Sequence, residues 1–466
     1  MTIIGAGIGG LVCGCYLVKS GYKVLIVEQH DKPGGYCTSF QRRGYRFDSA
    51  IHYLGGINNG ILGKIIDELN IRNKLKFYQP DPTDKIIMPD EITYIRKDHR
   101  DTLKEWQKSF PKEKTELSNF FKFISQKDVL NIYGATKNKS FRKILNSFFS
   151  DEHLKSALGV PLFGNMGLPP GRISAFTAII LFREFILDPG YYPEGGMQNF
   201  SDVLAQEFKS NNGDLLLSEK VINIGTANNE VTGVKLNSGE KINSRFVVSN
   251  CDAFQTFNTL LKQNTKEAAV TKKLKPSNSI FCIYTGVLNF LKKEQIDPCN
   301  IWYFKTYDLE RSYTLLGEKV RDINIPGVML SFPSLHDKTA IKDTVQIFTM
   351  ATFETKKFWD RQREAFAKKM FFMAKNILPS LANNLDVVIT ATPHTFYRYT
   401  YNYKGAAFGW ESTLNQIDSS LLPQKTSIKG LFLVGHWCTM GSGQGGVSTV
   451  ALSGMKAAKS IMTRSL

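Results

Sequence analysis

The feature that most constrains the fold of this chain is a glycine motif close to its first residue. Residues 2–4 have the pattern of a short buried strand and residues 11–19 that of an apolar helix, and the sequence between them includes GAGIGG. In a unit of strand, G-x-G-x-x-G and helix, the first glycine permits a tight turn, the second lets the backbone approach a pyrophosphate, and the third lets the helix press against the strand. We therefore predict a dinucleotide site made by Gly5, Ala6, Gly7, Ile8, Gly9 and Gly10.

An acidic residue after the next strand indicates which dinucleotide binds. Residues 23–27 form a second apolar run, and Glu28 follows it at the distance from the glycines that is usual for a ribose-binding acid. A carboxylate at this position accepts hydrogen bonds from the adenosine ribose and repels a 2′-phosphate. Glu28 and its neighbour Gln29 therefore favour NAD or FAD over NADP.

The residues after this acid point to FAD through a family resemblance. The segment 24–56, VLIVEQHDKPGGYCTSFQRRGYRFDSAIHYLGG, resembles the FAD signature of the phytoene desaturase, carotenoid isomerase and retinol saturase superfamily of FAD-dependent oxidoreductases. The resemblance implies that Gly34 and Gly35 lie beside the phosphates of FAD, next to Tyr36, which stands where many members carry Arg or Ser. It also implies that the stretch 48–52, which ends at His52, lies near the isoalloxazine.

A second glycine-rich turn lies near the other end of the sequence. Residues 431–434 read as an apolar strand, residues 447–461 as a helix with small side chains, and the turn between them includes GSGQGG. A strand, glycine turn and helix again present a helix N-terminus to an anion. The segment resembles the C-terminal flavin motif of the same superfamily, although a turn of this kind is also routine in folds that bind nothing. The resemblance implies flavin contacts from Gly435, His436, Gly445, Gly446 and Val447.

The middle of the chain adds two weaker matches. Residues 192–198, YPEGGMQ, resemble the superfamily's Y-P-x-G-G-M segment, which implies that Gly195, Gly196 and Met197 pass close to the flavin. Several short strands follow, with turns such as Asn-Asn-Glu between them. The backbone at Val221 would contact the adenine by analogy, and the alternative is an ordinary buried strand position.

These segments predict an α/β protein with a discontinuous cofactor domain. We expect a Rossmann-like FAD-binding domain of the glutathione-reductase and amine-oxidase type, with an interleaved α+β substrate domain packed closely against it. The FAD-binding domain is expected to comprise residues 1–75, 192–258 and 422–466, and the substrate-binding domain residues 76–191 and 259–421.

The aromatic content of the substrate domain bears on the ligand. Phe, Tyr and Trp are frequent there, and although most such residues belong to a core, a pocket that they line suits an apolar ligand. The resemblance implies a long polyene or isoprenoid lipid, desaturated, saturated or isomerised through hydride chemistry at N5 of the flavin. The sequence does not separate these reactions. A flavin amine oxidase and a lipid-binding protein with a structural FAD remain as alternatives.

Little acid–base machinery is expected for such a reaction. His52 and His436 are the histidines expected nearest the flavin, and Glu194 is a weaker candidate for moving a proton. Each histidine is also a candidate for a structural hydrogen-bonding role, and we assign no catalytic residue. The seven cysteines have no metal-ligand spacing, so we expect reduced thiols and no metal site.

The net charge of +17 favours anionic partners without choosing among them. No basic block with a nucleic-acid recognition motif occurs, and no secretory signal or membrane-spanning run is found, so we expect a cytoplasmic protein that is peripheral on a membrane at most. Residues 137–149 combine apolar residues at helical spacing with basic flanks. This segment is either an interfacial helix on anionic lipid or an ordinary helix whose apolar face lies in the core. The oligomeric state is not predicted.

Overall fold

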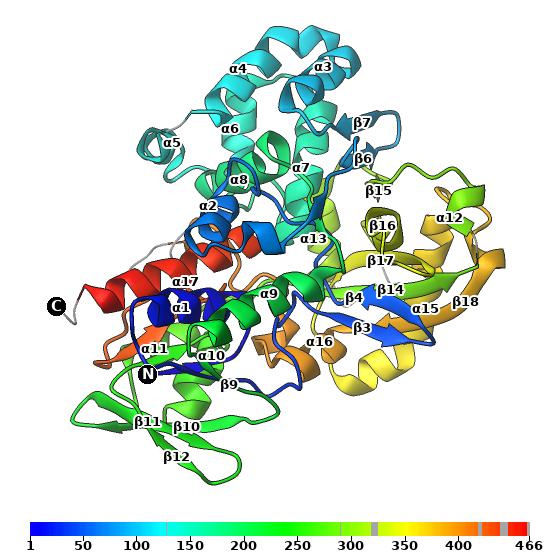
Figure 1. The fold of residues 1–466 in the computed structure, drawn as a ribbon. Helices are drawn as coiled ribbons and strands as arrows, with labels where there is room; N and C mark the ends of the chain where they lie inside the picture. Colours follow the sequence, from blue (N-terminus) through cyan, green and yellow to red (C-terminus); the bar gives the residue numbers. More distant parts are fainter. Residues whose placement is uncertain (127, 289, 318–324, 418–421, 439–445, 464–466) are drawn as a thin grey trace.

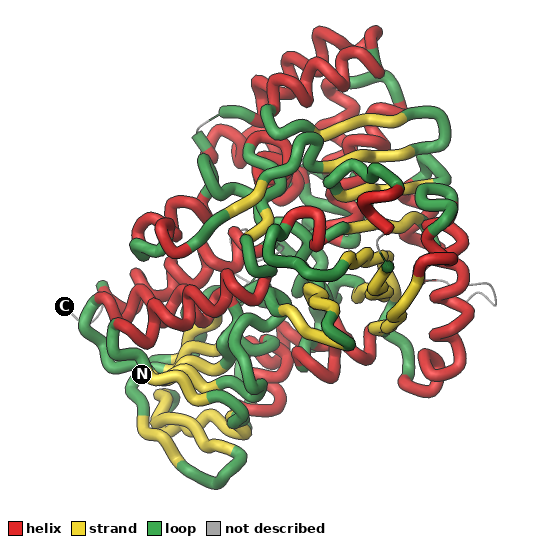
Figure 2. The backbone as a smooth tube through the Cα atoms, turned by 45° about the vertical axis from the view of Figure 1, so that its right-hand side comes forward, coloured by secondary structure: helices red, strands yellow, loops and turns green. Residues whose placement is uncertain are grey.

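The structure is a computed structural model that describes residues 1–126, 128–288, 290–317, 325–417, 422–438 and 446–463. Figure 1 shows three regions: a parallel sheet with both chain ends nearby, a mixed sheet at the right, and a group of helices at the top. Figure 2 shows the strands of the first two regions from another side, with helices packed around them.

The parallel sheet forms where the two glycine motifs predict strands. Its five strands lie in the order β19-β13-β1-β2-β9, and every described pair in it is parallel. The central strand β1 is buried on both faces, as expected for short apolar strands in a parallel sheet. The strands are β1 Thr2–Ile4, β2 Leu25–Val27, β9 Asp214–Leu216, β13 Val247–Ser249 and β19 Leu431–Leu433.

Four helices pack around this sheet, and two of them come from opposite ends of the chain. Helix α1 begins three residues before its predicted start because Gly7 is its N-cap. A Cβ atom on Gly454 of α17 would lie 2.3 Å from the carbonyl oxygen of Gly9, so the axes of α1 and α17 can approach only because glycine is present. The helices are α1 Ile8–Lys19, α2 Ile61–Glu68, α9 Met197–Ser210 and α17 Val447–Met462.

Smaller elements surround the parallel sheet. An antiparallel sheet of three strands, in the order β10-β11-β12, lies at the bottom of Figure 1. Two further antiparallel pairs are the hairpin of β3 and β4 and the pair of β5 and β8, whose strands lie far apart in the sequence. These elements are β10 Val221–Ala227, β11 Glu230–Leu236, β12 Lys241–Asn243, β3 Ser39–Arg42, β4 Tyr45–Asp48, β5 Phe77–Tyr78, β8 Tyr192–Pro193, α10 Ala253–Gln255 and α11 Lys266–Thr271.

The mixed sheet has seven strands in the order β18-β14-β17-β16-β15-β6-β7. Only the β15 and β6 pair is parallel among its described pairs. The elements are β6 Asp84–Ile87, β7 Ile92–Ile95, β14 Ser279–Val287, β15 Asn300–Phe304, β16 Gly327–Ser331, β17 Asp343–Ala351, β18 Leu385–Ala391, α12 Phe290–Lys293, α13 Leu309–Gly317, α14 Pro333–His336, α15 Lys356–Lys375 and α16 Pro393–Thr400.

The helical region packs against one side of this sheet and shares a core with it. Helix α8 continues into a π-helical turn at Arg183–Leu187, an irregularity that is often found at functional sites. The helices are α3 His99–Ser109, α4 Lys114–Ile124, α5 Val129–Thr136, α6 Phe141–Phe148, α7 Glu152–Met166 and α8 Ala175–Phe182.

Residues 141–148 of the segment 137–149 form α6, which is an ordinary helix of this region and not an interfacial one. Phe141, Ile144, Leu145 and Phe149 are buried in the shared core. Their side chains already contact protein, so this apolar face is not free to enter a lipid surface. The interpretation as an interfacial helix is therefore wrong for these residues, and the alternative that the sequence left open is correct. None of the described helices is both long and apolar enough to cross a membrane.

The two predicted domains meet over a large buried surface. The strands of the parallel sheet lie in the ranges predicted for the FAD-binding domain, and those of the mixed sheet lie in the ranges predicted for the substrate-binding domain. The boundaries themselves stay a prediction. At the interface, His336 of α14 is buried among the rings of Tyr53, Tyr78 and Tyr192, and its Nε2 lies 3.0 Å from the Tyr53 hydroxyl.

Burial lowers the pKa of His336 to about 3, whereas a histidine in an unfolded chain titrates near pH 6.5. As the pH falls from about 6.5 toward 3, the unfolded state binds the proton more readily, so the free energy of unfolding falls. We expect His336→Gln to make the loss of stability between pH 7 and pH 5 smaller, by up to about 2 kcal/mol. Urea unfolding at the two pH values measures this difference. The exposed His153 gives a control, His153→Gln, and an unchanged pH dependence in His336→Gln would contradict the account.

Candidate active site

One cavity runs from the parallel sheet into the substrate domain. It begins at the carboxyl ends of β1, β2 and β13, passes Tyr36 and the start of α17, and continues between α7, α8 and the mixed sheet. The carboxyl ends of strands are where ligands bind in open parallel sheets. The cavity therefore joins the two glycine motifs to the aromatic part of the substrate domain.

The first glycine motif forms the wall at one end of this cavity. Gly5, Gly7 and Ile8 line the cavity, together with Gly34 and Gly35, as the sequence predicts. Gly5, Gly34 and Gly35 have φ of 95°, 126° and 62°, positive values that residues other than glycine rarely adopt. The turn thus exposes backbone to a ligand where a side chain would fill the space.

The other residues of the motif act through packing. A Cβ atom on Gly10 would lie 2.2 Å from the carbonyl oxygen of Gly5, which is the close helix approach expected for the third glycine. A Cβ atom on Gly9 would lie 2.7 Å from Oδ1 of Asn250. The amide of Ala6 donates a hydrogen bond to Oε2 of Glu28 over 2.7 Å. These three residues lie behind the cavity wall and fix the shape of the turn.

Glu28 occupies the position expected of a ribose-binding acid. Its carboxylate accepts hydrogen bonds from the amides of Ala6, over 2.7 Å, and His30, over 2.9 Å, and these bonds hold the carboxylate at the cavity wall. Gln29 and Val221 line the same end of the cavity. Glu28, Gln29 and Val221, which the sequence predicts to lie together, therefore share one end of the cavity.

The start of α17 forms the opposite wall. Its N-cap is Gly446, which gives no side-chain cap, and the N-cap of α1 is likewise an uncapped glycine, Gly7. Both helix starts therefore present the positive end of a helix dipole to the cavity, which suits a ligand that carries negative charge. Gly435, His436 and Val447 line this region as predicted, and the predicted Gly445 lies outside the described residues.

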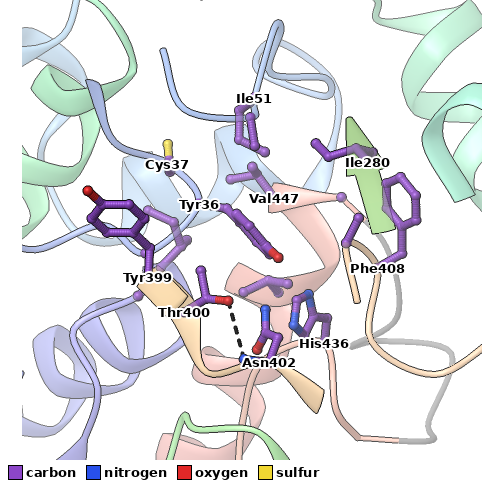
Figure 3. A pocket seen from close by; sticks show the side chains of 18 of the residues that line it. Tyr36, Cys37, Ile51, Ile280, Tyr399, Thr400, Asn402, Phe408, His436 and Val447 are labelled. Carbon is purple, nitrogen blue, oxygen red and sulfur yellow. Dashed lines mark hydrogen bonds between the residues drawn. The ribbon is translucent and has the colours of Figure 1, made fainter. Parts of the chain in front are cut away.

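Tyr36 lies between the two ends. Figure 3 shows its ring in the middle of the cavity, with Val447 above it and His436 below it. Its hydroxyl donates to the carbonyl oxygen of Ala406 over 3.0 Å, so the side chain points across the cavity toward the substrate domain. The side chain therefore does not take the phosphate-contacting role that Arg or Ser could fill.

Several lining residues escaped the sequence interpretation. Asn250 follows β13, and its Nδ2 donates to the carbonyl oxygen of Gly5 over 3.3 Å. Residues 399–402, at the end of α16 and directly after it, form the side of the cavity near Tyr36 (Figure 3). Asn250 follows β13, which pairs with β1 in the parallel sheet, so the strand order alone would have placed it there. No motif marks the residues 399–402.

Four predicted residues lie away from the cavity. Gly195, Gly196 and Met197 do not line it, and the amides of Gly195 and Met197 instead donate to the carboxylates of Asp337 and Asp48, each over 3.1 Å. Glu194 forms an ion pair with Lys76 over 2.8 Å, so it is not placed to move a proton in the cavity. Residues 194–197 therefore do not line the cavity, and two of their amides instead bind carboxylates, one of them Asp48 at the end of β4.

His52 lines the cavity with both ring nitrogens already hydrogen-bonded. Asn165 donates its Nδ2 to the carbonyl oxygen of Pro161 over 2.8 Å, so its Oδ1 is the atom that accepts from Nε2 of His52 over 3.1 Å. The Nδ2 of Asn300 donates to Nδ1 of His52 over 2.9 Å. Burial lowers the pKa of His52 to about 4. The ring is therefore neutral at pH 7 with its proton on Nε2, which favours a structural role over proton transfer.

His436 is the second histidine in the cavity. Burial lowers the pKa of His436 to about 4, so it is also neutral at pH 7. Its ring lies 6.2 Å from the ring of Tyr36 and 5.3 Å from that of Trp437, measured between centroids. A neutral imidazole in this position can accept a hydrogen bond without placing a positive charge beside a ligand.

The far half of the cavity is apolar. Its lining comes from α7, α8 and the strands β14 to β17, and includes Phe163, Leu181, Phe185, Ile280, Trp302, Phe304, Met329, Phe348, Met350 and Phe408. Figure 3 shows Ile280 and Phe408 side by side at this end. Some of the aromatic residues that the sequence offered belong here, and others, such as Phe281, belong to the core.

Comparison with known proteins shows which family has this arrangement. A model of the family described as flavin containing amine oxidoreductase matches residues 8–462. The chain belongs to this family. It is therefore a flavin-containing oxidoreductase, and the two uncapped helix starts and the glycine turn fit the anionic pyrophosphate of a flavin dinucleotide.

Relatives confirm the resemblance that the sequence motifs carry. The chain is 22% identical over 501 residues to an all-trans-retinol 13,14-reductase of Rattus norvegicus, covering 93% of this chain and 81% of the relative. It is 24% identical over 504 residues to a chloroplastic prolycopene isomerase of Daucus carota, and the match covers 98% of this chain and 78% of the relative. A solved oxidoreductase from Methanosarcina mazei matches this structure with a TM-score of 0.68 at 18% identity, over 98% of this chain and 99% of that one. This match confirms the α/β fold class with its Rossmann-like cofactor domain.

The glycine turn yields a direct test of cofactor binding. Gly7 has an ordinary φ of −68°, and a Cβ atom there would meet only the side chain of Asn250, at 2.8 Å. We expect Gly7→Ala to fold and to bind flavin more weakly, since the methyl group fills the space in which a phosphate meets the backbone. Loss of one hydrogen bond to a charged group is worth about 1.5–3 kcal/mol, so Kd should rise about 10- to 100-fold.

Flavin titration of the apoprotein, followed by fluorescence, measures this Kd. Gly134 in α5 has no atom near its Cβ position, so Gly134→Ala is a matched control that should bind flavin normally. Equal affinity of Gly7→Ala and the unaltered protein would show that the turn does not hold the cofactor.

Proposed function

We propose that this protein is an FAD-dependent oxidoreductase that acts on a long apolar polyene or isoprenoid lipid, such as a carotenoid or retinoid, by desaturation, saturation or cis–trans isomerisation. The family match supports a flavin, and the acid at Glu28 together with the length of the cavity favours the dinucleotide FAD. The relatives named for retinol and prolycopene reactions support the substrate class.

The observation that carries the proposal is that none of the described residues that line the far half of the cavity carries a charge. Among the described lining residues, the carboxylates are Glu28, Glu219 and Asp252, and all three lie at the end formed by the parallel sheet and β10. The polar side chains described in the far half are neutral, namely His52, Asn165, Trp302 and Thr349. A protonated amine would lose its hydration there without a compensating anion, whereas a hydrocarbon would gain from the transfer.

The chain's own groups position the ligand and exclude water. FAD, when bound, supplies a hydride acceptor or donor at N5 of its isoalloxazine. The apolar wall holds an extended hydrocarbon against that region, and Tyr36 fixes one side of the passage through its bond to Ala406. His52 and His436, both neutral, add no positive charge that would oppose a cationic character developing along a conjugated chain.

The cofactor-binding residues follow from the same proposal. We assign the phosphate contacts to Gly5, Gly7, Gly34 and Gly35, the ribityl-phosphate region to Gly435 and His436, and the isoalloxazine contacts to Gly446 and Val447. Glu28 would accept hydrogen bonds from the ribose, and the backbone at Val221 would contact the adenine. We place the protein in the cytoplasm, where a peripheral contact with a membrane would give access to lipids.

An amine oxidase and a lipid carrier with a structural flavin are the competing functions. Anaerobic mixing distinguishes all three: a polyene or isoprenoid that changes the flavin absorbance supports the proposal, an amine that bleaches it supports the oxidase, and a carrier shows no change with any ligand or reductant. Mass analysis of lipid that co-purifies with the protein identifies the ligand. A water-soluble amine in place of a conjugated or isoprenoid lipid would overturn the proposal.

The apolar half also gives a prediction by substitution. Ile280 of β14 lines the cavity, so Ile280→Trp should fill part of it and raise KM for an isoprenoid substrate at least about tenfold, because a well-packed site resists added volume. Ile280→Val, which removes one methylene group, should stay within about threefold of the unaltered protein. Steady-state kinetics measure both values. Unchanged KM in Ile280→Trp, with normal flavin content, would place the substrate elsewhere.

A further inference from the structure

Helix α5 carries an apolar surface that no other described part of the protein covers. Leu130, Tyr133 and Val129 are 79%, 49% and 44% exposed, although all three are large and apolar or aromatic. They lie within a sector of about 100° on the helix, next to the side on which Ile132 and Thr136 are buried. Figure 1 shows α5 at the outer edge of the helical region. A cluster of this kind on one helix face marks an interaction site.

The residues that follow α5 give this surface a positive charge. Lys137 and Lys139 come directly after the helix and are exposed, and neither has an ion-pair partner among the described residues. No Asp or Glu occurs from residue 129 to residue 150. The adjacent acid, Asp128, accepts a hydrogen bond from the amide of Leu130 over 2.8 Å and so serves as the cap of the helix. An apolar face flanked by unpaired lysines is complementary to anionic lipid headgroups above a hydrocarbon layer.

The same helix is connected to the wall of the cavity. The ring of Tyr133 packs edge-on against Phe176 of α8, with centroids 5.3 Å apart. Leu181 and Phe185, at the other end of α8 and its π-helical extension, line the cavity. At 1.5 Å per residue, the distance along the helix from Phe176 to Phe185 is about 14 Å. A bilayer in contact with α5 would therefore lie close to the cavity wall.

We propose that Val129, Leu130, Tyr133, Lys137 and Lys139 form a docking surface that places the protein on an anionic lipid bilayer. The apolar contact comes from α5 and not from α6, because Phe141, Ile144 and Leu145 of α6 are buried whereas Val129, Leu130 and Tyr133 of α5 are exposed. Lys137 and Lys139, which belong to the segment 137–149, supply the charge. The proposal rests on the proposed function in one respect, because an apolar substrate has to leave a bilayer to reach the cavity. Docking on the bilayer can be measured without turnover.

Flotation of the flavin-loaded full chain with phosphatidylcholine vesicles, with and without added phosphatidylserine, tests the proposal. We expect flotation with the anionic vesicles only, weakening as salt is added. Leu130→Asp should lower the partition coefficient at least about tenfold, and the pair Lys137→Gln and Lys139→Gln should lower it about 30-fold, since each lysine near an anionic surface contributes about 1 kcal/mol.

Two matched controls keep the test specific. Ile341 is 95% exposed in the loop before β17, so Ile341→Asp removes an apolar side chain elsewhere on the surface. Lys241 of β12 and Lys262 are exposed near the nucleotide domain, so Lys241→Gln with Lys262→Gln makes the same change in net charge. Both controls should float like the unaltered protein. Flavin absorbance and turnover of detergent-dispersed substrate should be normal in Leu130→Asp.

Three results would overturn the proposal. They are no flotation with anionic vesicles, equal flotation of the α5 variants and the controls, and a dimer in solution that Leu130→Asp dissociates, which would make this face an interface between copies of the chain. If the docking result holds while no polyene or isoprenoid reacts, the proposed function fails and the docking surface stands.

Discussion

Helices α1 and α17 pack so closely that a Cβ atom on Gly454 would lie 2.3 Å from the carbonyl oxygen of Gly9 and 3.0 Å from the amide nitrogen of Cys13. This contact joins segments from opposite ends of the sequence and aligns two helices whose glycine N-caps supply no side-chain hydrogen bond to the first amides. Because both helix starts border one cavity, an anionic ligand there meets two positive helix ends at once. The position of the cavity, and of everything that lines it, depends on this packing.

The second consequence of this packing is a cavity with two different ends. Carboxylates and backbone amides line the end at the parallel sheet, whereas aromatic and aliphatic side chains from the substrate domain line the other. His52 lies at the transition, where Asn165 and Asn300 bind its two ring nitrogens and burial keeps the ring neutral. A dinucleotide and a hydrocarbon can therefore share one continuous space, with no described charge in the apolar half.

The sequence predicted the backbone geometry at the parallel-sheet end of the cavity well, because that geometry depends on where glycine is required. Glycines at positive φ, an acid after the second strand and a glycine N-cap all follow from local pattern. The segment around Gly195 does not line the cavity, because the amides of Gly195 and Met197 donate to the buried carboxylates of Asp337 and Asp48, a tertiary contact that no local pattern encodes. The amphipathic pattern of 137–149 was ambiguous for a related reason, since periodicity shows that a helix has an apolar face and not what covers it.

A crystal structure of the protein with FAD tests the central claim most directly. The account predicts one FAD per chain, with its adenosine ribose at Glu28, its pyrophosphate over Gly7 and Gly35, and its isoalloxazine between Tyr36 and the start of α17, facing the apolar half of the cavity. A flavin that lies elsewhere, or an isoalloxazine that does not reach α17, would contradict it.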